Sequence, residues 1–146
     1  MTEEFRIAIL GAGNIGTSIA KGLVQSGHFA PARITLTRRR VHLLEDFKAQ
    51  GFDVSNDNIS AVNASDVVIV SVEPQLVDGV LEQIAPALDF DRHILISVVT
   101  GISLHQIEAK LGKRMRIARA MPNTAIAVRE SMTCIASNGP DDKALE

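Results

Sequence analysis

A glycine-rich segment near the N-terminus places the strongest constraint on the fold. Gly11, Gly13 and Gly16 are spaced as G-x-G-x-x-G, between the apolar run 5–10 and a stretch with helical spacing, 14–27. Glycines at this spacing let a strand turn sharply into a helix that packs closely against it. The segment therefore predicts a strand–loop–helix unit of the kind that opens many α/β sheets.

The remainder of the chain repeats the order of a short apolar strand followed by a helix. This alternation predicts βαβ units with right-handed crossovers. We therefore expect an α/β fold, namely a doubly wound, mostly parallel, Rossmann-like sheet with helices on both faces. Further strands are expected at 34–37, 52–54, 66–72, 93–99, 115–121 and 131–136, and further helices at 41–50, 58–64, 75–88 and 103–111.

Two of these segments contribute most to the predicted core. Residues 66–72 are mainly β-branched and almost uninterrupted in their apolar character, as is typical of central parallel strands. Residues 75–88 carry apolar side chains at helical spacing. We expect the following side chains of that helix to point inward: Leu76, Val80, Leu81, Ile84 and Leu88.

The composition argues against several function classes. A net charge of −2 does not suit a nucleic-acid-binding protein or a polybasic membrane-binding surface. No apolar stretch is long enough for a transmembrane helix, and the acidic start does not resemble a signal peptide. The single cysteine, Cys134, excludes an intrachain disulfide and suits a reducing cytoplasm. We therefore expect a cytoplasmic protein with no nucleic-acid and no membrane partner.

The chain contains no internal linker before residue 138. We expect 1–137 to form one domain of this Rossmann-like fold, because the strand and helix signals follow one another without a break. Residues 138–140 read Asn-Gly-Pro, which interrupts the chain, and 141–146 look like the start of a helix. We interpret 138–146 as the beginning of a helix that leads to a further domain.

The glycine segment is also a candidate phosphate-binding loop. Gly11 permits the tight turn, Gly13 lets the backbone approach a pyrophosphate, and Gly16 lets the helix pack on the strand. Free backbone N–H groups at the positive end of the helix dipole then bind the anion. The alternative is a plain glycine turn. The candidate loop comprises Gly11, Ala12, Gly13, Asn14, Ile15 and Gly16.

The end of the second predicted strand favours one form of the cofactor. NAD-selective sites usually place Asp or Glu about 20 residues past the glycines, where it bonds the ribose 2′-hydroxyl. Here the chain reads Thr37, Arg38, Arg39, Arg40, with no acid. Because a guanidinium pairs bidentately with a phosphate, we predict a preference for NADP(H), held first by Arg38 and then by Arg39. The alternative is a solvated basic start to the next helix.

Three further segments, 72–74, 98–100 and 121–124, end strands at the edge of the sheet where such folds bind ligands. Pro74 should hold Glu73 extended and start the next helix. Polar side chains in these turns can hydrogen-bond a nicotinamide amide or a substrate carboxylate, although ordinary capped turns use the same residue types. The candidates are Val72, Glu73, Pro74, Val98, Val99 and Thr100 for the cofactor, and Met121, Pro122, Asn123 and Thr124 for the substrate.

Four ordered blocks carry a family resemblance. They read ILGAGNIG at 9–16, SDVVIVSVEPQ at 65–75, ISVVTGISL at 96–104 and RAMPNT at 119–124. With these blocks the sequence resembles the amino-terminal domain of pyrroline-5-carboxylate reductase, the last enzyme of proline synthesis. The resemblance implies NADP-dependent reduction of the cyclic imine 1-pyrroline-5-carboxylate to proline, with this chain supplying the cofactor-binding domain.

The resemblance also implies where the cofactor lies. It places the pyrophosphate on 11–16, the 2′-phosphate near Arg38 and the adenine near Asn58. It places 72–74 along the cofactor. In the family, a second, all-helical domain forms the dimer and closes the active site, so a homo-oligomer is implied for a full-length protein. The segments implied near the nicotinamide and the substrate are 98–100 and 121–124.

The chain departs from the family pattern in and beside these segments, and also at Ser131 or Met132, where the family usually has Gly. Glu73 stands where the family usually has Lys, Thr100 where it has Ala, and Ala125 where it has Pro. A carboxylate beside a phosphate-rich cofactor is unfavourable unless it points away or is neutralised. Because the second domain is missing, we expect these 146 residues alone to bind NADP(H) but to reduce the imine poorly.

Hydride chemistry resides in the cofactor, so no nucleophile is required, and we predict no catalytic side chain and no metal site. The histidines at 28, 42, 93 and 105 are scattered, and we expect them on the surface. Two other functions stay open. One is a stand-alone NADP-binding regulatory module. The other is a different NADP-linked oxidoreductase with the same domain, such as a deazaflavin-linked enzyme or a 3-hydroxy acid dehydrogenase, which should depart from the 121–124 turn.

Overall fold

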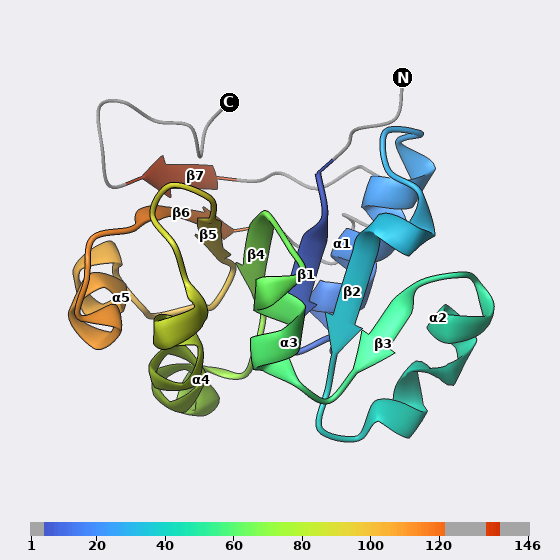
Figure 1. The fold of residues 1–146 in the computed structure, drawn as a ribbon, viewed down its shortest axis with the longest axis horizontal. Helices are drawn as coiled ribbons and strands as arrows, with labels where there is room; N and C mark the ends of the chain where they lie inside the picture. The colour runs from blue at the N-terminus through green and yellow to red at the C-terminus, as the bar shows by residue number, and fades with distance from the viewer. Residues whose placement is uncertain (1–4, 122–133, 138–146) are drawn as a thin grey trace.

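The computed structural model describes residues 5–121 and 134–137. They form a seven-stranded sheet in the order β3-β2-β1-β4-β5-β6-β7 (Figure 1). Strands β1 to β6 run parallel, and β7 pairs antiparallel with β6. The predicted fold class is therefore confirmed. The strands are β1 (Ile7–Leu10), β2 (Ile34–Thr37), β3 (Asp53–Ser55), β4 (Val67–Val70), β5 (Ile94–Ser97), β6 (Arg116–Met121) and β7 (Cys134–Ser137).

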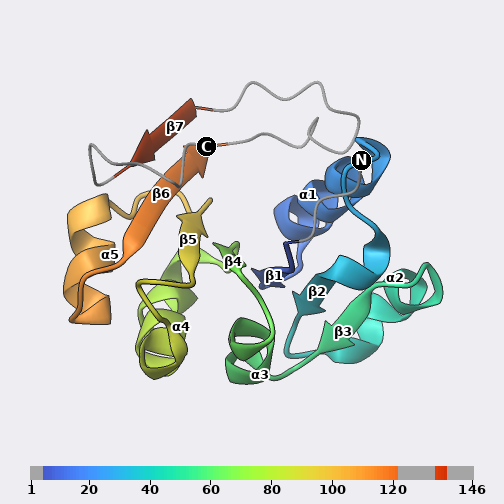
Figure 2. The same ribbon diagram turned by 45° about the horizontal axis from the view of Figure 1, so that its top comes forward.

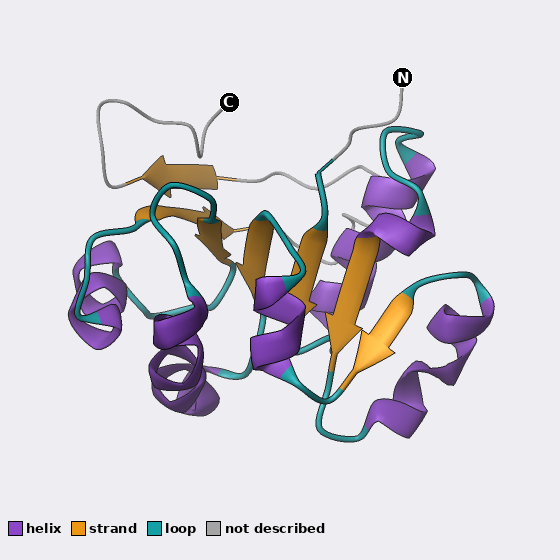
Figure 3. Cartoon of the chain, in the orientation of Figure 1, coloured by secondary structure: helices purple, strands orange, loops and turns teal. Residues whose placement is uncertain are grey.

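Helices cover both faces of the sheet (Figures 2 and 3). Helices α1 and α2 pack on one face, and α3, α4 and α5 pack on the other. Four short 3₁₀ segments connect them. The helices are α1 (Asn14–Gln25), α2 (Glu45–Ala49), α3 (Asn58–Asn63), α4 (Val77–Ile84) and α5 (Leu104–Leu111), with η1 (Pro31–Arg33), η2 (Val41–Leu44), η3 (Pro74–Leu76) and η4 (Ala85–Ala87).

Two predicted helices are wound differently from the expectation. The 41–50 helix begins as η2, and the 75–88 helix is α-helical only in α4. Pro86 has no backbone N–H to donate within an α-helix, so the chain after Ile84 tightens into η4. Leu76 was predicted to point inward, which is wrong. It lies in η3, where the 3₁₀ winding turns it off the buried face of α4, and it is 36% exposed.

Strand β1 lies between β2 and β4, and its side chains alternate between the two cores. Ala8 and Leu10 pack with α3, α4 and α5, whereas Ile7 and Ile9 pack with α1 and α2. The chain leaves β1 toward β2 on one side and later returns to β4 on the other. The carboxyl end of β1 is therefore the point where strand order reverses, which is where doubly wound sheets bind ligands.

His93 is buried at 2% exposure, so its predicted surface position is wrong. Its Nδ1 accepts a hydrogen bond from the Asp89 N–H at 2.9 Å, and its Nε2 lies 3.0 Å from the Val62 carbonyl oxygen. This pairing assigns the neutral tautomer with the proton on Nε2. The ring therefore ties the end of α3 to the turn before β5. A lone histidine in the sequence gives no sign of a backbone partner such as the Val62 carbonyl oxygen, 31 residues away.

None of the described helices is long and apolar enough to cross a membrane. Within 5–121 and 134–137, His, Cys, Asp and Glu side chains form no group of three that could hold a metal ion.

Candidate functional site

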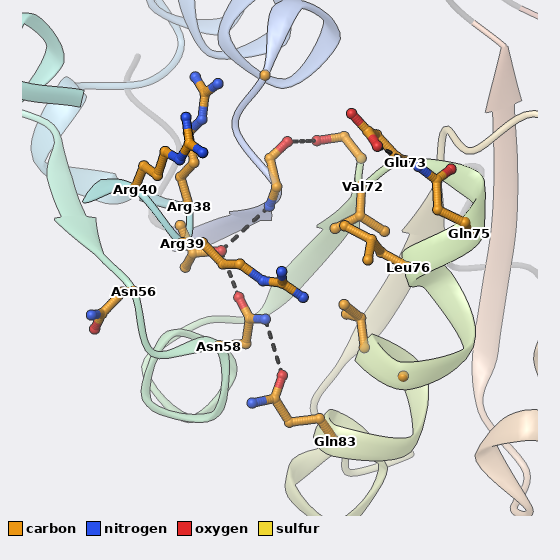
Figure 4. Close-up of a pocket in the computed structure, with 16 residues that line it drawn as sticks. Arg38, Arg39, Arg40, Asn56, Asn58, Val72, Glu73, Gln75, Leu76 and Gln83 are labelled. Carbon is orange, nitrogen blue, oxygen red and sulfur yellow. Dashed lines mark hydrogen bonds between the residues drawn. The ribbon is translucent and has the colours of Figure 1, made fainter. Parts of the chain in front are cut away.

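A cavity of about 700 Å³ opens at the carboxyl ends of β1, β2 and β4 (Figure 4). One wall comes from the glycine turn after β1, a second from the end of β2 and the start of α3, and a third from the end of β4 and α4. Its lining residues are Gly11, Gly13, Thr37, Arg38, Arg39, Arg40, Asn56, Asn58, Ser71, Val72, Glu73, Gln75, Leu76, Gly79, Val80 and Gln83.

Gly11 makes the turn that begins the glycine loop. Its φ of +83° lies in the left-handed region, and a Cβ at this position would lie 2.6 Å from Val72 Cγ1. The N–H groups of Gly11 and Ala12 both donate to the Thr37 carbonyl oxygen, at 3.1 and 2.8 Å. The turn is therefore fixed against the ends of both β2 and β4, and glycine is required at 11 for conformation and for space.

The other two glycines have different surroundings. A Cβ on Gly16 would lie 2.6 Å from Ser71 Oγ and 3.0 Å from the Gly11 carbonyl oxygen, so this glycine lets α1 pack on the turn. Apart from the neighbours of Gly13 along the chain, none of the described residues has an atom within 4 Å of the position that a Cβ on Gly13 would occupy. Gly13 lies at the N-cap of α1, where the first N–H groups of any α-helix have no acceptor within the helix. The open space there suits an anion on the helix N-terminus.

Thr37 and Asn58 both line the cavity, and hydrogen bonds position them there. Thr37 Oγ1, which is buried, donates to Asn58 Oδ1 at 2.6 Å, and Asn58 Nδ2 donates to Gln83 Oε1 at 3.1 Å. This chain of hydrogen bonds joins β2, α3 and α4 along the floor of the cavity. Asp57 caps α3, and its hydrogen bonds from the Ser60 hydroxyl and N–H hold the pKa of Asp57 below its ordinary value.

The three arginines after β2 line the same cavity. Arg38 is half-buried, its N–H donates to the Ser55 carbonyl oxygen at 3.1 Å, and its Nη1 lies 3.5 Å from the Ala12 carbonyl oxygen. Arg39 is exposed, and Figure 4 shows it extending across the cavity near Asn58. The basic end of β2 therefore lies beside the glycine turn, as the prediction of a 2′-phosphate site requires. Arg40 also lines the cavity.

Glu73 lies on the β4 side of the cavity, away from the arginines (Figure 4). Its backbone is extended and Pro74 starts η3, which confirms the prediction for this pair. Glu73 Oε2 accepts a hydrogen bond from Gln75 Nε2 at 2.5 Å. Within the described part of the lining, Glu73 is the only acidic residue.

Several predicted site residues do not line this cavity. Val99 is buried in the core with α5, Val98 packs on the α1 side, and Thr100 is exposed after β5. Ala12 is buried and can meet a ligand only through its backbone. The contacts predicted for these residues stay predictions. Asn14 and Pro74 are exposed, and Ile15 packs into the core beside α1. Met121 is the last residue of β6, and the predictions for 122–124 fall outside the described residues.

The sequence analysis missed most of the third wall. Ser71 donates to the Gly11 carbonyl oxygen at 2.7 Å and so supports the turn. Gly79 and Gln83 on α4, one turn apart, face the cavity together with Leu76 of η3. A polar residue at the end of the apolar 66–72 run was a usable signal for Ser71. A Gln at helical spacing from a Gly and a Leu is too common to indicate a site.

These residues fit a dinucleotide. Gly13 leaves room for a pyrophosphate at the α1 N-terminus, guanidinium groups border the β2 side, and the volume lies within the usual range for small-molecule sites, about 300–1,000 Å³. When bound, a nicotinamide dinucleotide supplies or accepts a hydride. The loop 11–16 would hold its pyrophosphate, and Arg38 and Arg39 would lie at its adenosine end.

Comparison with known proteins agrees with this geometry. The family model described as NADP oxidoreductase, coenzyme F420-dependent, matches residues 6–101. The chain belongs to this family. The cavity is accordingly the candidate dinucleotide site of a domain of this NADP oxidoreductase family.

Similar proteins extend the match beyond residue 101. Two curated relatives from Dictyostelium discoideum are pyrroline-5-carboxylate reductase 1, 43% identical over 96% of this chain, and reductase 2, 46% identical over 90%. The chain spans 27% and 44% of their lengths. A solved pyrroline-5-carboxylate reductase from Coxiella burnetii is 34% identical, with a TM-score of 0.89 over 98% of this chain and 53% of that protein. A Plasmodium falciparum pyrroline carboxylate reductase with NADP bound shares the fold, with a TM-score of 0.85 at 22% identity over 99% of this chain and 53% of its own.

Proposed function

We propose that this chain is the cofactor-binding domain of an NADP(H)-dependent reductase that acts on the C=N bond of 1-pyrroline-5-carboxylate and yields proline. The observation that carries the proposal is the end of β2, where three arginines and no carboxylate border the glycine turn. A guanidinium there pairs with a 2′-phosphate, which NAD(H) lacks. The substrate class is supported by relatives of this activity that align across nearly the whole chain.

The chain's own residues bind and orient the cofactor in this proposal. The first backbone N–H groups of α1, which follow Gly13, bind the pyrophosphate, and Arg38 and Arg39 select the 2′-phosphate. Thr37 and Asn58 fix the floor against which the adenosine lies. We infer that the substrate meets Asn123 and Thr124 and that no described side chain is needed as a nucleophile. A homo-oligomer and a cytoplasmic location belong to the same proposal.

A second candidate is an NADP oxidoreductase that uses coenzyme F420, because the family description names this cofactor. The family match ends at residue 101, before the 121–124 turn that should separate the two activities. The curated reductases align with that turn included, which favours the C=N reductase.

A chimera tests the substrate directly. This chain replaces the matching amino-terminal segment of Dictyostelium pyrroline-5-carboxylate reductase 2, and NADPH oxidation is followed with 1-pyrroline-5-carboxylate and, separately, with oxidised F420. The proposal expects turnover with the imine only, and strong loss on Arg38→Ala. Turnover with F420 only would replace the proposal by the second candidate. A folded, NADPH-binding chimera without activity on the imine would refute the substrate assignment.

A further inference from the structure

The sheet order determines which end of the cofactor each wall meets. The glycine turn follows β1, with β2 on one side and β4 on the other. If the pyrophosphate lies on the turn and the 2′-phosphate lies at the end of β2, the second half of the dinucleotide must cross the end of β4. Glu73 follows β4, so it borders the nicotinamide half and not the adenosine half.

Glu73 is built into this wall and is not a loose surface charge. Pro74 follows it and starts η3, so the Glu73 backbone is held extended. Gln75, which also lines the cavity, donates to Oε2 and orients the carboxylate. Within the described residues Glu73 forms no ion pair, and its Oε1 accepts no hydrogen bond. One carboxylate oxygen is thus left for a ligand.

A free carboxylate oxygen accepts hydrogen bonds and repels phosphate. The nicotinamide half of the cofactor offers two kinds of uncharged donor, the carboxamide N–H₂ and the vicinal 2′- and 3′-hydroxyls of its ribose, and it is the ribose that is joined directly to the pyrophosphate on the turn. We propose that Glu73 binds the hydroxyls of the nicotinamide ribose and thereby positions the nicotinamide half. This inference rests on the proposed function and makes Glu73 a positioning residue, with Gln75 holding its carboxylate.

The opposite interpretation is that the carboxylate only weakens binding by repelling the pyrophosphate. The two interpretations predict opposite signs. Removing the charge weakens cofactor binding if Glu73 holds the ribose, and strengthens it if Glu73 repels phosphate. The change in affinity should also differ among cofactor fragments, because only fragments that contain the second ribose can contact Glu73 through it.

Calorimetry on the 146-residue chain separates these cases with three ligands: NADP⁺, 2′-phospho-ADP-ribose and 2′,5′-ADP. The first two carry the second ribose, and the third ends at the adenosine. We expect Glu73→Ala to weaken the affinity for the first two ligands by about tenfold and to change the affinity for 2′,5′-ADP by no more than about twofold. The affinities of Glu73→Gln, which keeps an acceptor oxygen, should lie between those of the parent chain and those of Glu73→Ala. Glu82→Gln is the matched control, because it removes an exposed carboxylate of α4 that pairs with Lys110 outside the cavity.

Three results would overturn the inference: Glu73→Ala changes the affinity for all three ligands equally, changes none of them, or strengthens the binding of NADP⁺ and 2′-phospho-ADP-ribose. Thermal unfolding of each variant identifies a folding defect, and Glu73→Gln remains informative if Glu73→Ala unfolds. Failure of the cofactor assignment looks different, because the unmodified chain would then bind none of the three ligands, and failure of the substrate assignment appears only in the chimera.

Discussion

Ser71 Oγ lies 2.6 Å from the position that a Cβ on Gly16 would occupy. The same hydroxyl donates to the Gly11 carbonyl oxygen at 2.7 Å. Ser71 thus fills the space that Gly16 leaves and fixes the first glycine of the loop. The end of β4 and the start of α1 are fitted to each other at this point, so the loop depends on both.

Gly16→Ala should therefore destabilise the fold. The new methyl group meets Ser71 Oγ and the Gly11 carbonyl oxygen, and overpacking of this kind costs about 1–3 kcal/mol. Urea denaturation measures the loss. Adding Ser71→Ala removes the nearer atom, so the double variant should lose less than the sum of the two single variants. If the double variant instead loses as much stability as the two single variants together, the contact with Ser71 Oγ is not the reason that glycine is required at position 16.

Gly13→Ala should separate binding from stability. Nothing in the described protein lies within 4 Å of the added Cβ, and φ is −88°, so the free energy of unfolding should stay within about 1 kcal/mol of the parent. The methyl group does take the room left for the pyrophosphate, so NADPH affinity should fall at least tenfold in a fluorescence titration. Unchanged affinity would mean that the phosphate lies elsewhere.

The sequence predicted the local parts of this site and not the parts that need the fold. The glycine loop, the arginines and Pro74 are each contiguous in the chain, so short-range patterns are enough to locate them. The orientation of Leu76 depends on 3₁₀ winding in η3, which the apolar periodicity hides. Gln83 contacts the Asn58 side chain and His93 contacts the Val62 carbonyl oxygen, and both of these partners are more than 20 residues away, so only the packed sheet brings them near.

His93 should matter for stability and not for cofactor binding. His93→Leu leaves the Asp89 N–H and the Val62 carbonyl oxygen without their partners and should cost about 2–4 kcal/mol. His105→Leu, on the exposed side of α5, is the control and should change stability by less than about 0.5 kcal/mol. Denaturant unfolding and NADPH titration are compared on both variants. An equal cost for the two histidines would contradict the assigned pairing.

Asp57 should contribute stability that depends on pH. Its hydrogen bonds with Ser60 hold its folded pKa below the unfolded value of about 3.9, so the contribution is complete above that value and is lost as pH falls through the folded pKa. Asp57→Asn keeps a cap acceptor without a titrating charge. The stability difference between parent and variant should be constant from pH 7 to about 5 and shrink in more acidic solution. A difference that is independent of pH would contradict this account.

The most direct test of the central claim is the ratio of NADPH to NADH affinity, measured by calorimetry on the 146-residue chain and on Arg38→Ala and Arg39→Ala. The account predicts that the parent chain prefers NADPH by tenfold or more, about 1.4 kcal/mol, and that the arginine variants lose this preference while retaining NADH affinity. Equal affinity for the two dinucleotides in the parent chain, or no binding of either, would contradict it.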